Sequence, residues 1–494
     1  MARFSFFLRY YFNRMRFVPS EHHSIFIVDR PCPPVSEVKR GSFSSRRGFI
    51  LAAAACAVGL GNLWRFPYLT SHYGGGIFVL VYVIIAMTFG FSLMLTEIAI
   101  GRKTGKTCIQ AFGDLCHRHR WIGYLSATVP FLLASVYFVI GSWVTKWFAN
   151  CATGQLHSMV DYGGNYWWDF ISGGIEGFVG PVVFFLIFSA VCIIFVVRGV
   201  EKGIEKVNLL LMPMLIVLMI GVTVYSLVTI EGIWDGVVYY LAPDFNKLTM
   251  GTLLGAVSQV FFSMSLSSGA MMAYGSYMRK EDSIEESVKG ISLIDTGVAI
   301  IAGLMIVPAA YTFGFEDSQG MGLLFTVMPT VFANMVSGNV ISTLFYFFVL
   351  IAAATSAVAM FEALVAQIID RTNIQRKKAI IATIAFLIPA GLLVIFGFGP
   401  LMTNLYPFDQ GVGLLGIVDT VSNSILMPLI AIATCIFVGY VIGTDAITEE
   451  VESFGNPFKR KWIYIRMIKY VCPLLLGVML VLGLLDQMNI FSLY

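Results

Sequence analysis

Hydrophobic residues along this chain gather in long runs rather than in the short alternations of half-buried helices and strands. A run of about 20 apolar residues is the length that a helix needs to cross about 30 Å of hydrocarbon. The pattern predicts eleven spans, at residues 49–70, 75–100, 122–148, 178–197, 206–228, 250–277, 288–313, 338–369, 379–397, 413–443 and 464–485. The predicted fold class is therefore an all-α integral membrane protein.

Two of these runs contain residues that interrupt a helix or that lipid tolerates poorly. The first run includes AVGLGNLWRFP from Ala57 to Pro67, with the helix expected to be interrupted at Ala57–Asn62, and the sixth is expected to be interrupted at SMSLSSG, from Ser263 to Gly269. Unwound backbone in a bilayer leaves polar groups that protein, water or a ligand must satisfy, so both segments should line a cavity. Matching interruptions at the start of two five-span halves indicate a transporter site. For SLSSG alone, close helix packing is an equal alternative.

Composition and charge narrow the class further. Hydrophobic residues make up 57% of the 494 residues and charged residues only 12%, against about 25% charged in soluble domains. The net charge of +3 gives no indication of a nucleic-acid partner. None of the eight cysteines has close metal-ligand spacing, and only Cys151 falls in a predicted outer loop, so no extracellular disulfide is expected.

The distribution of Lys and Arg predicts the orientation. They cluster in alternate loops, whereas the loops near 149–178, 229–249, 314–337 and 398–412 contain acids and only Lys247 as a cation. Lys146, at the edge of the third span, is the other exception. The positive-inside rule then places the N-terminus in the cytoplasm and the C-terminus outside.

The chain divides into a tail and one transporter domain. Residues 1–39 mix arginines, aromatic residues and prolines, and are expected to form a disordered cytoplasmic tail, with an amphipathic surface anchor as the alternative. The transporter domain is expected over 40–486, with repeats at about 47–228 and 250–443 and an extra helix at 464–485. A short extracellular C-terminus, 487–494, should follow.

Several motifs resemble one known family. Residues 57–78 read AVGLGNLWRFPYLTSHYGGGIF and residues 96–105 read TEIAIGRKTG. Further matching pieces are VYFVIGSW, SQVFFSMSLSSGAMMAYGSY, AAATSAVAMFE and DTVSNSILMPL. Together they resemble the neurotransmitter:sodium symporters from about Arg40 to Asp486, and the short outer loops resemble the bacterial branch. The resemblance implies a LeuT-like five-plus-five inverted repeat with broken helices one and six, in the bacterial inner membrane.

The same resemblance implies two sodium ions, held by the carbonyl and hydroxyl oxygens that suit a hard cation. Ligands of the first implied site are the Ala57 carbonyl and the side chains of Asn62, Ser263 and Asp295. Ligands of the second are the carbonyls of Ala55, Val58 and Ala352 and the hydroxyls of Thr355 and Ser356. Hydroxyls bonded within their own helix would also explain Thr355 and Ser356.

Asp295 is the most informative charge, because it stands in the otherwise apolar run ISLIDTGVAIIAGLMIVPAA. A carboxylate inside the membrane is costly unless it is paired. Chloride-dependent relatives bind the anion beside hydroxyl and amide groups, and Tyr82, Gln259 and Ser263 match that neighbourhood. A fixed carboxylate would replace the anion, so we expect transport without chloride.

For the substrate, the resemblance implies an amino acid bound at the two interruptions. The free N–H groups of a half-helix N-terminus suit a carboxylate. The implied contacts are Ala57, Leu60, Gly61, Leu133, Tyr137, Phe262, Ser263, Ser265, Ser268, Ser356 and Met360. Ser268 stands where a bulky aromatic is frequent and Ser267 where glycine is usual, which makes room for a large or aromatic side chain.

Gates and a hinge follow from the same matches. Arg65 is expected to pair with Asp419 at the outer gate and Arg40 with Asp370 at the inner one, with an ordinary inner-loop anchor as the alternative for Arg40. Glu97 is expected to bond unwound backbone. Gly203 and Pro213 suggest a hinge in the fifth span, or a simple kink.

The predicted function is sodium-coupled uptake of an amino acid by alternating access. The partners expected are the amino acid and membrane lipid, with monomer and homodimer both open. A transporter of an osmolyte or amine is the main alternative, and a membrane sensor that binds amino acids without transport is another. An enzyme is disfavoured, because no nucleophile–base or metal cluster is apparent in the sequence.

Overall fold

The computed structural model describes residues 42–162, 165–174, 177–315, 320–398 and 413–487. Helices dominate these ranges, and the β-type pairing found in them is an isolated bridge between Gly75 and Pro243. The prediction of an all-α protein is confirmed. The predicted tail and the Arg40 gate residue lie outside the described residues.

Nine helices in the described ranges are long and apolar enough to cross a membrane. A tenth span consists of Arg46–Ala57 and Gly61–His72, which meet at an angle of 56°. The predicted span at 250–277 is divided into α13 (Met250–Ser263) and α14 (Ala270–Ser276), each too short to cross alone. The nine helices, the bent pair and the divided span correspond to the eleven predicted spans.

The first half of the fold contains these segments: α2 (Arg46–Ala57), η1 (Gly61–Arg65), α3 (Phe66–His72), α4 (Gly76–Ile85), η2 (Ala86–Gly90), α5 (Phe91–Thr104), α6 (Cys108–Leu115), η3 (His117–His119), α7 (Arg120–Ala152), α8 (Leu156–Asp161), α9 (Tyr166–Ile171), α10 (Val179–Val197), η4 (Val200–Glu205), α11 (Lys206–Thr229), α12 (Ile233–Leu241) and η5 (Phe245–Lys247). Among them η1, η2 and η4 are π-helical turns. Such turns are frequent at functional sites. Gly203 lies in η4, and Pro213 lies inside α11.

The second half and the last helices contain these segments: α13, α14, α15 (Ile284–Thr312), η6 (Leu323–Val327), α16 (Met328–Ala333), α17 (Gly338–Thr372), α18 (Arg376–Phe396), α19 (Gly413–Asp419), η7 (Thr420–Leu426), α20 (Met427–Ile436), η8 (Phe437–Val441), α21 (Asp445–Glu452), η9 (Ser453–Gly455), α22 (Lys461–Arg466), η10 (Met467–Val471) and α23 (Cys472–Gln487).

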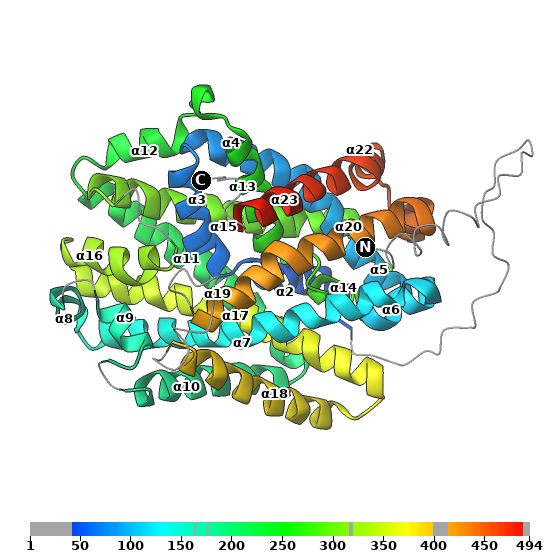
Figure 1. Cartoon of the computed structure of the whole chain (residues 1–494), viewed down its shortest axis with the longest axis horizontal. Coiled ribbons are helices and arrows are strands. Elements are labelled where there is room, and N and C mark those ends of the chain that lie inside the picture. The colour runs from blue at the N-terminus through cyan, green and yellow to red at the C-terminus, as the bar shows by residue number, and fades with distance from the viewer. Residues whose placement is uncertain (1–41, 163–164, 175–176, 316–319, 399–412, 488–494) are drawn as a thin grey trace, which may run out of the picture. The chain divides into compact units, whose positions relative to one another are not determined.

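The two halves pack through reciprocal helix pairs. The first span packs against the seventh through α2 and α15, and the sixth packs against the second through α14 and α5. In the same way, α7 packs against α18 and α17 packs against α10, while α7 and α17 pack against each other (Figure 1). When the halves are exchanged, the first two pairs map onto each other, as do α7–α18 and α17–α10, and the α7–α17 pair maps onto itself, as a five-plus-five repeat requires.

Small residues allow the central helices to approach closely. Helix α2 carries a run of four alanines, Ala52 to Ala55, all fully buried. A Cβ atom added to Gly101 of α5 would lie 2.1 Å from the Met272 carbonyl of α14, and one added to Gly275 would lie 2.5 Å from the Ile98 carbonyl. Backbones in contact over small residues are typical of membrane helix packing. The two interrupted spans are therefore held near the centre of the bundle.

Candidate ion and substrate site

The first interruption is short. Helix α2 ends at Ala57, Val58 is extended with ψ of 104°, and the chain resumes as the π-helical turn η1 at Gly61. The predicted interruption at Ala57–Asn62 was wider than the observed one, because η1 takes up Gly61 and Asn62. The carbonyl groups at the end of α2 are nevertheless released from the helical ladder and face neighbouring side chains.

The second interruption covers Met264–Gly269, between α13 and α14. Ser265 and Ser267 have φ angles of 51° and 61°, a left-handed conformation that is costly for residues with a side chain. Glu97 compensates by accepting a hydrogen bond from the Ser267 N–H at 2.5 Å. The expectation that Glu97 bonds unwound backbone is confirmed.

Three predicted ligands of the first sodium site meet at one point. Asn62 Nδ2 donates to Ser263 Oγ at 3.0 Å and to Asp295 Oδ1 at 2.8 Å, and Ser263 Oγ lies 2.8 and 2.9 Å from the two Asp295 oxygens. All three side chains are buried. Asn62 Oδ1 accepts from the Gly59 N–H at 3.0 Å, which ties the cluster to the first interruption. A buried carboxylate surrounded by neutral groups favours a cation beside it.

The residues of the predicted chloride neighbourhood do not all lie around Asp295. Tyr82 is fully buried beside Asp295. Gln259 instead donates to the Gly61 carbonyl at 3.1 Å and lies near Arg65. Gln259 therefore satisfies backbone of the first interruption in this structure.

The predicted ligands of the second sodium site also converge. Ser356 Oγ lies 3.1 Å from the Ala55 carbonyl oxygen and 2.9 Å from that of Val58. The neighbouring Thr355 hydroxyl donates within α17, to the carbonyls of Ile351 at 3.0 Å and Ala352 at 3.1 Å. The internal bonding considered for Thr355 is therefore present. It uses the hydroxyl proton and leaves the oxygen lone pairs available.

The predicted substrate residues surround the same two interruptions. The Leu60 N–H donates to the Tyr137 hydroxyl at 2.8 Å, and Ser265 Oγ donates to the Cys56 carbonyl at 3.3 Å. A Cβ atom on Gly59 would lie 2.3 Å from the Tyr137 hydroxyl, so this approach requires glycine. Other predicted contacts are buried or half-buried, namely Leu133, Met360, Ser268 and Phe262.

The gate residues make different contacts from those expected. Arg65 donates to Ser258 Oγ at 2.8 Å and to the Ser258 carbonyl at 3.1 Å, and its guanidinium lies 5.1 Å from the centre of the Phe262 ring. Asp419 accepts from Asn423 at 2.6 Å. No direct ion pair joins Arg65 to Asp419 in the described part of the chain, although the guanidinium is close enough to interact electrostatically with the carboxylate. Because an exposed ion pair contributes only about 1 kcal/mol, a hydroxyl and a carbonyl on the adjacent α13 can replace it.

At the opposite end of the site, Asp370 of α17 accepts from the backbone N–H and the hydroxyl of Thr107, both at 2.7 Å. Its predicted partner, Arg40, lies outside the described residues. Thr107 lies just before α6, in the connection between α5 and α7. The hydrogen bonds of Asp370 therefore attach the end of α17 to this connection.

Two important contacts were missed by sequence reasoning. The Glu205 carboxylate of η4 accepts from the Ser44 N–H at 2.8 Å and from the Ser44 hydroxyl at 2.7 Å, just before α2 begins. Glu362 of α17 pairs with Arg376 of α18 at 2.5 Å. A lone acid at the end of AAATSAVAMFE was a usable signal for Glu362, whereas nothing local indicated the partner of Glu205.

Comparisons with known proteins agree with this geometry. A family model described as the sodium:neurotransmitter symporter family matches residues 40–169 and 170–492. The uncharacterized sodium-dependent transporter YhdH of Bacillus subtilis is 33% identical over 447 residues, which cover 89% of this chain and 97% of YhdH. The uncharacterized sodium-dependent transporter MJ1319 of Methanocaldococcus jannaschii is 30% identical over 445 residues, covering 85% and 86%.

Among solved structures, the crystal structure of MhsT in complex with L-phenylalanine has a TM-score of 0.80 and 32% sequence identity, and the match covers 90% of this chain and 100% of MhsT. The predicted LeuT-like fold is thereby confirmed, as is the absence of an enzyme function, because members of the matching family are transporters. This chain belongs to the sodium:neurotransmitter symporter family and is a sodium-dependent, multi-pass membrane transporter.

Proposed function

We propose that this transporter couples two sodium ions to the uptake of an amino acid with a large hydrophobic or aromatic side chain, without a requirement for chloride. The observation that carries the proposal is the meeting of two interrupted helices around two oxygen-rich clusters, one built on Asn62, Ser263 and Asp295 and one on Ser356. Supporting it, the structurally similar MhsT was crystallised with L-phenylalanine.

The first cluster supports a sodium site that includes a charge. The Asp295 carboxylate is fully buried and its described contacts come from neutral donors, Asn62 and Ser263. A sodium ion would supply the missing positive charge, and the Ala57 carbonyl lies at the adjacent helix end. The negative charge that chloride provides in some relatives would then already be present, which supports chloride independence.

The second cluster supports a neutral sodium site. Released carbonyls of Ala55 and Val58 point at the Ser356 hydroxyl, and the Thr355 oxygen is the next one along α17. With a sodium ion bound, the Ser356 hydroxyl would rotate its proton away from these carbonyls, and its oxygen and both carbonyl oxygens would face the ion. Carbonyl and hydroxyl oxygens suit sodium because both are hard, neutral ligands.

The substrate carboxylate is proposed to bind the N–H groups of Leu60 and Gly61. In the structure the Tyr137 hydroxyl accepts the Leu60 N–H, so the tyrosine and the carboxylate would share this end of the helix. The amino group would meet the carbonyls of Ala57, Phe262 and Ser263 and the Ser265 hydroxyl. Leu133, Ser268 and Met360 would surround the side chain.

An uptake assay tests this proposal. Purified protein in liposomes would be given a panel of radiolabelled amino acids with an inward sodium gradient, in chloride or in gluconate. We expect uptake of phenylalanine or another large amino acid that stops when potassium replaces sodium and that is equal in both anions. Uptake of an osmolyte or amine but of no amino acid would favour the alternative substrate class. Binding without uptake would favour a sensor.

The membrane orientation is part of the proposal. Cationic residues cluster in alternate loops, which supports a cytoplasmic N-terminus in the bacterial inner membrane. With this orientation, sodium entering down its gradient gains about 2.3 kcal/mol per charge for each 100 mV of membrane potential. Coupling to two ions would therefore concentrate the amino acid strongly inside the cell.

A further inference from the structure

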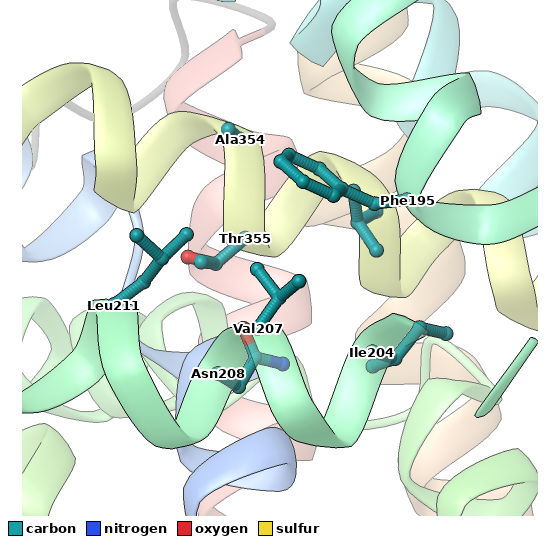
Figure 2. Close-up of a pocket in the computed structure, with 8 residues that line it drawn as sticks. Phe195, Ile204, Val207, Asn208, Leu211, Ala354 and Thr355 are labelled. Carbon is teal, nitrogen blue, oxygen red and sulfur yellow. The ribbon is translucent and has the colours of Figure 1, made fainter. Parts of the chain in front are cut away.

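A small cavity lies on the side of Thr355 that faces α11. Its walls include Thr355 and Ala354 of α17, Val207, Asn208 and Leu211 of α11, and Phe195 of α10 (Figure 2). The space left for the centre of a water molecule is about 10 Å³, about the least that holds one water. Except for the Thr355 hydroxyl and the Asn208 amide, the side chains lining it are apolar.

The Asn208 amide group lacks a hydrogen-bond partner for its nitrogen among the described residues. This nitrogen, Nδ2, is fully buried, and the residue is only 2% exposed. A buried amide N–H without a partner is destabilising by about 1–3 kcal/mol. Such groups are therefore normally satisfied by protein or by an ordered water.

Thr355 presents a complementary acceptor on the opposite wall. Its hydroxyl proton is directed to the carbonyls of Ile351 and Ala352, so its lone pairs remain free. A water that accepts from Asn208 Nδ2 can donate to one of these lone pairs. The Thr355 oxygen would then be fixed with its other lone pair available to an ion near the carbonyls of Ala55 and Val58.

We propose that Asn208 is a positioning residue of the second sodium site, acting through one water molecule held between its amide and the Thr355 hydroxyl. The inference rests on the proposed assignment of Thr355 to a sodium ion. It adds a residue on α11 to a site whose other members lie on α2 and α17. Asn208 touches the water and not the ion.

The test measures sodium-dependent thermal stabilisation of the purified full chain, with NaCl titrated against choline chloride at constant ionic strength. Asn208→Leu keeps the size and removes the donor. We expect the NaCl concentration for half-maximal stabilisation to rise about threefold to tenfold, the effect of one hydrogen bond. Asn208→Ser retains a donor with room for the water and should stay within about twofold, as should the matched control Leu210→Met, at an exposed position of α11 away from the cavity.

Two outcomes separate the inference from the proposed function. If Thr355→Ala raises the sodium requirement while Asn208→Leu leaves it unchanged, the sodium site stands and the role of Asn208 is refuted. If Thr355→Ala also has no effect, the sodium assignment itself fails. Should Asn208→Leu not fold, a high-resolution structure of the wild-type chain decides. Water density within hydrogen-bond distance of both Asn208 Nδ2 and Thr355 Oγ1 supports the inference, and its absence overturns it.

Discussion

At the scale of single residues, the site is held together by polar groups that satisfy one another. The Ser356 hydroxyl lies between the Ala55 and Val58 carbonyls, and Tyr137 accepts the Leu60 N–H. Each of these atoms is also one that the proposed ions or substrate would contact. Binding would therefore exchange internal hydrogen bonds for ligand contacts, at little cost in unsatisfied groups.

Ser356→Ala tests the second sodium cluster. The change removes the hydroxyl that satisfies two released carbonyls, so the free energy of unfolding should fall by about 1–3 kcal/mol. The sodium concentration for half-maximal uptake should rise at least about tenfold, the effect of about 1.4 kcal/mol. The control is Ser342→Ala, which removes a buried hydroxyl bonded within the same helix, to Asn339. Equal sodium dependence in both variants would contradict the assignment.

Asp295→Asn tests the charge in the first cluster. The amide keeps the size and can still accept from Asn62, but the negative charge beside the proposed ion is lost. Uptake in chloride-free buffer should fall at least about tenfold, the effect of about 1.4 kcal/mol. Chloride should restore part of it, because Tyr82 and Ser263 lie beside the position. Asp235→Asn, on an exposed face of α12, is the control. Unchanged chloride-free uptake by Asp295→Asn would refute the role of the carboxylate.

At the scale of elements, the decisive features are the two helix interruptions. The first needs only Val58 and Gly59 to leave the helix, whereas the second uses six residues with several left-handed φ angles. The first depends on close approach by Tyr137 and Ser356, and the second on the Glu97 carboxylate of α5. The first interruption is therefore stabilised by α7 and α17, and the second by α5.

Gly59→Ala tests the close approach at the first interruption. The added Cβ would lie 2.3 Å from the Tyr137 hydroxyl and 2.9 Å from Ser356 Oγ, so one of them must move. Uptake should fall at least about tenfold, because overpacking of this kind costs about 1–3 kcal/mol. Gly297→Ala in α15 has no atom within 4 Å of the added Cβ and should stay close to wild type. Full activity of Gly59→Ala would show that the site tolerates a wider first interruption.

At the scale of the whole molecule, one buried arginine connects segments that are far apart in the chain. Arg102 at the end of α5 donates to Glu450 of α21 at 2.8 Å, to the Asp282 carbonyl at 2.6 Å and to Ser453 at 2.9 Å. Its side chain is completely buried. The loop between the last two spans is thereby attached to the second span and to the segment before α15.

Arg102→Lys tests this connection. Lysine keeps the charge but cannot reproduce the planar set of donors, so several partners lose a hydrogen bond. The free energy of unfolding should fall by about 1–3 kcal/mol, measured by thermal unfolding in detergent. Arg198→Lys, at an exposed position, should change it by less than about 0.5 kcal/mol. Equal stability of the two variants would show that the Arg102 contacts contribute little.

The sidedness of the whole molecule is a separate prediction. Single cysteines would replace exposed Asn246 and Glu449 in a chain without its own cysteines. A membrane-impermeant thiol reagent should label position 246 in intact cells, and position 449 only after the membrane is opened. The positive-inside rule places the loop that contains residue 449, between the last two spans, in the cytoplasm. The reverse labelling pattern would invert the proposed topology.

Much of the fold was determined by the sequence alone. Span positions agree with the helices to within a few residues, because crossing a membrane depends on the length and hydrophobicity of one segment. The interruptions were visible for a similar reason, since glycine, asparagine and clustered serines are local features. The family motifs added which of these residues belong to one site, including Asn62, Ser263 and Asp295.

The hydrogen-bond and ion-pair partners of the polar side chains were decided only by the tertiary structure. Arg65 binds Ser258 rather than Asp419, Glu205 satisfies the start of α2, and Arg102 reaches Glu450 across 348 positions. Such contacts depend on how helices distant in sequence pack and rotate against one another, and a buried polar group takes whichever partner this packing brings within reach. The sequence therefore determined the spans and their interruptions, and the packing of the two halves decided which polar atoms meet between them.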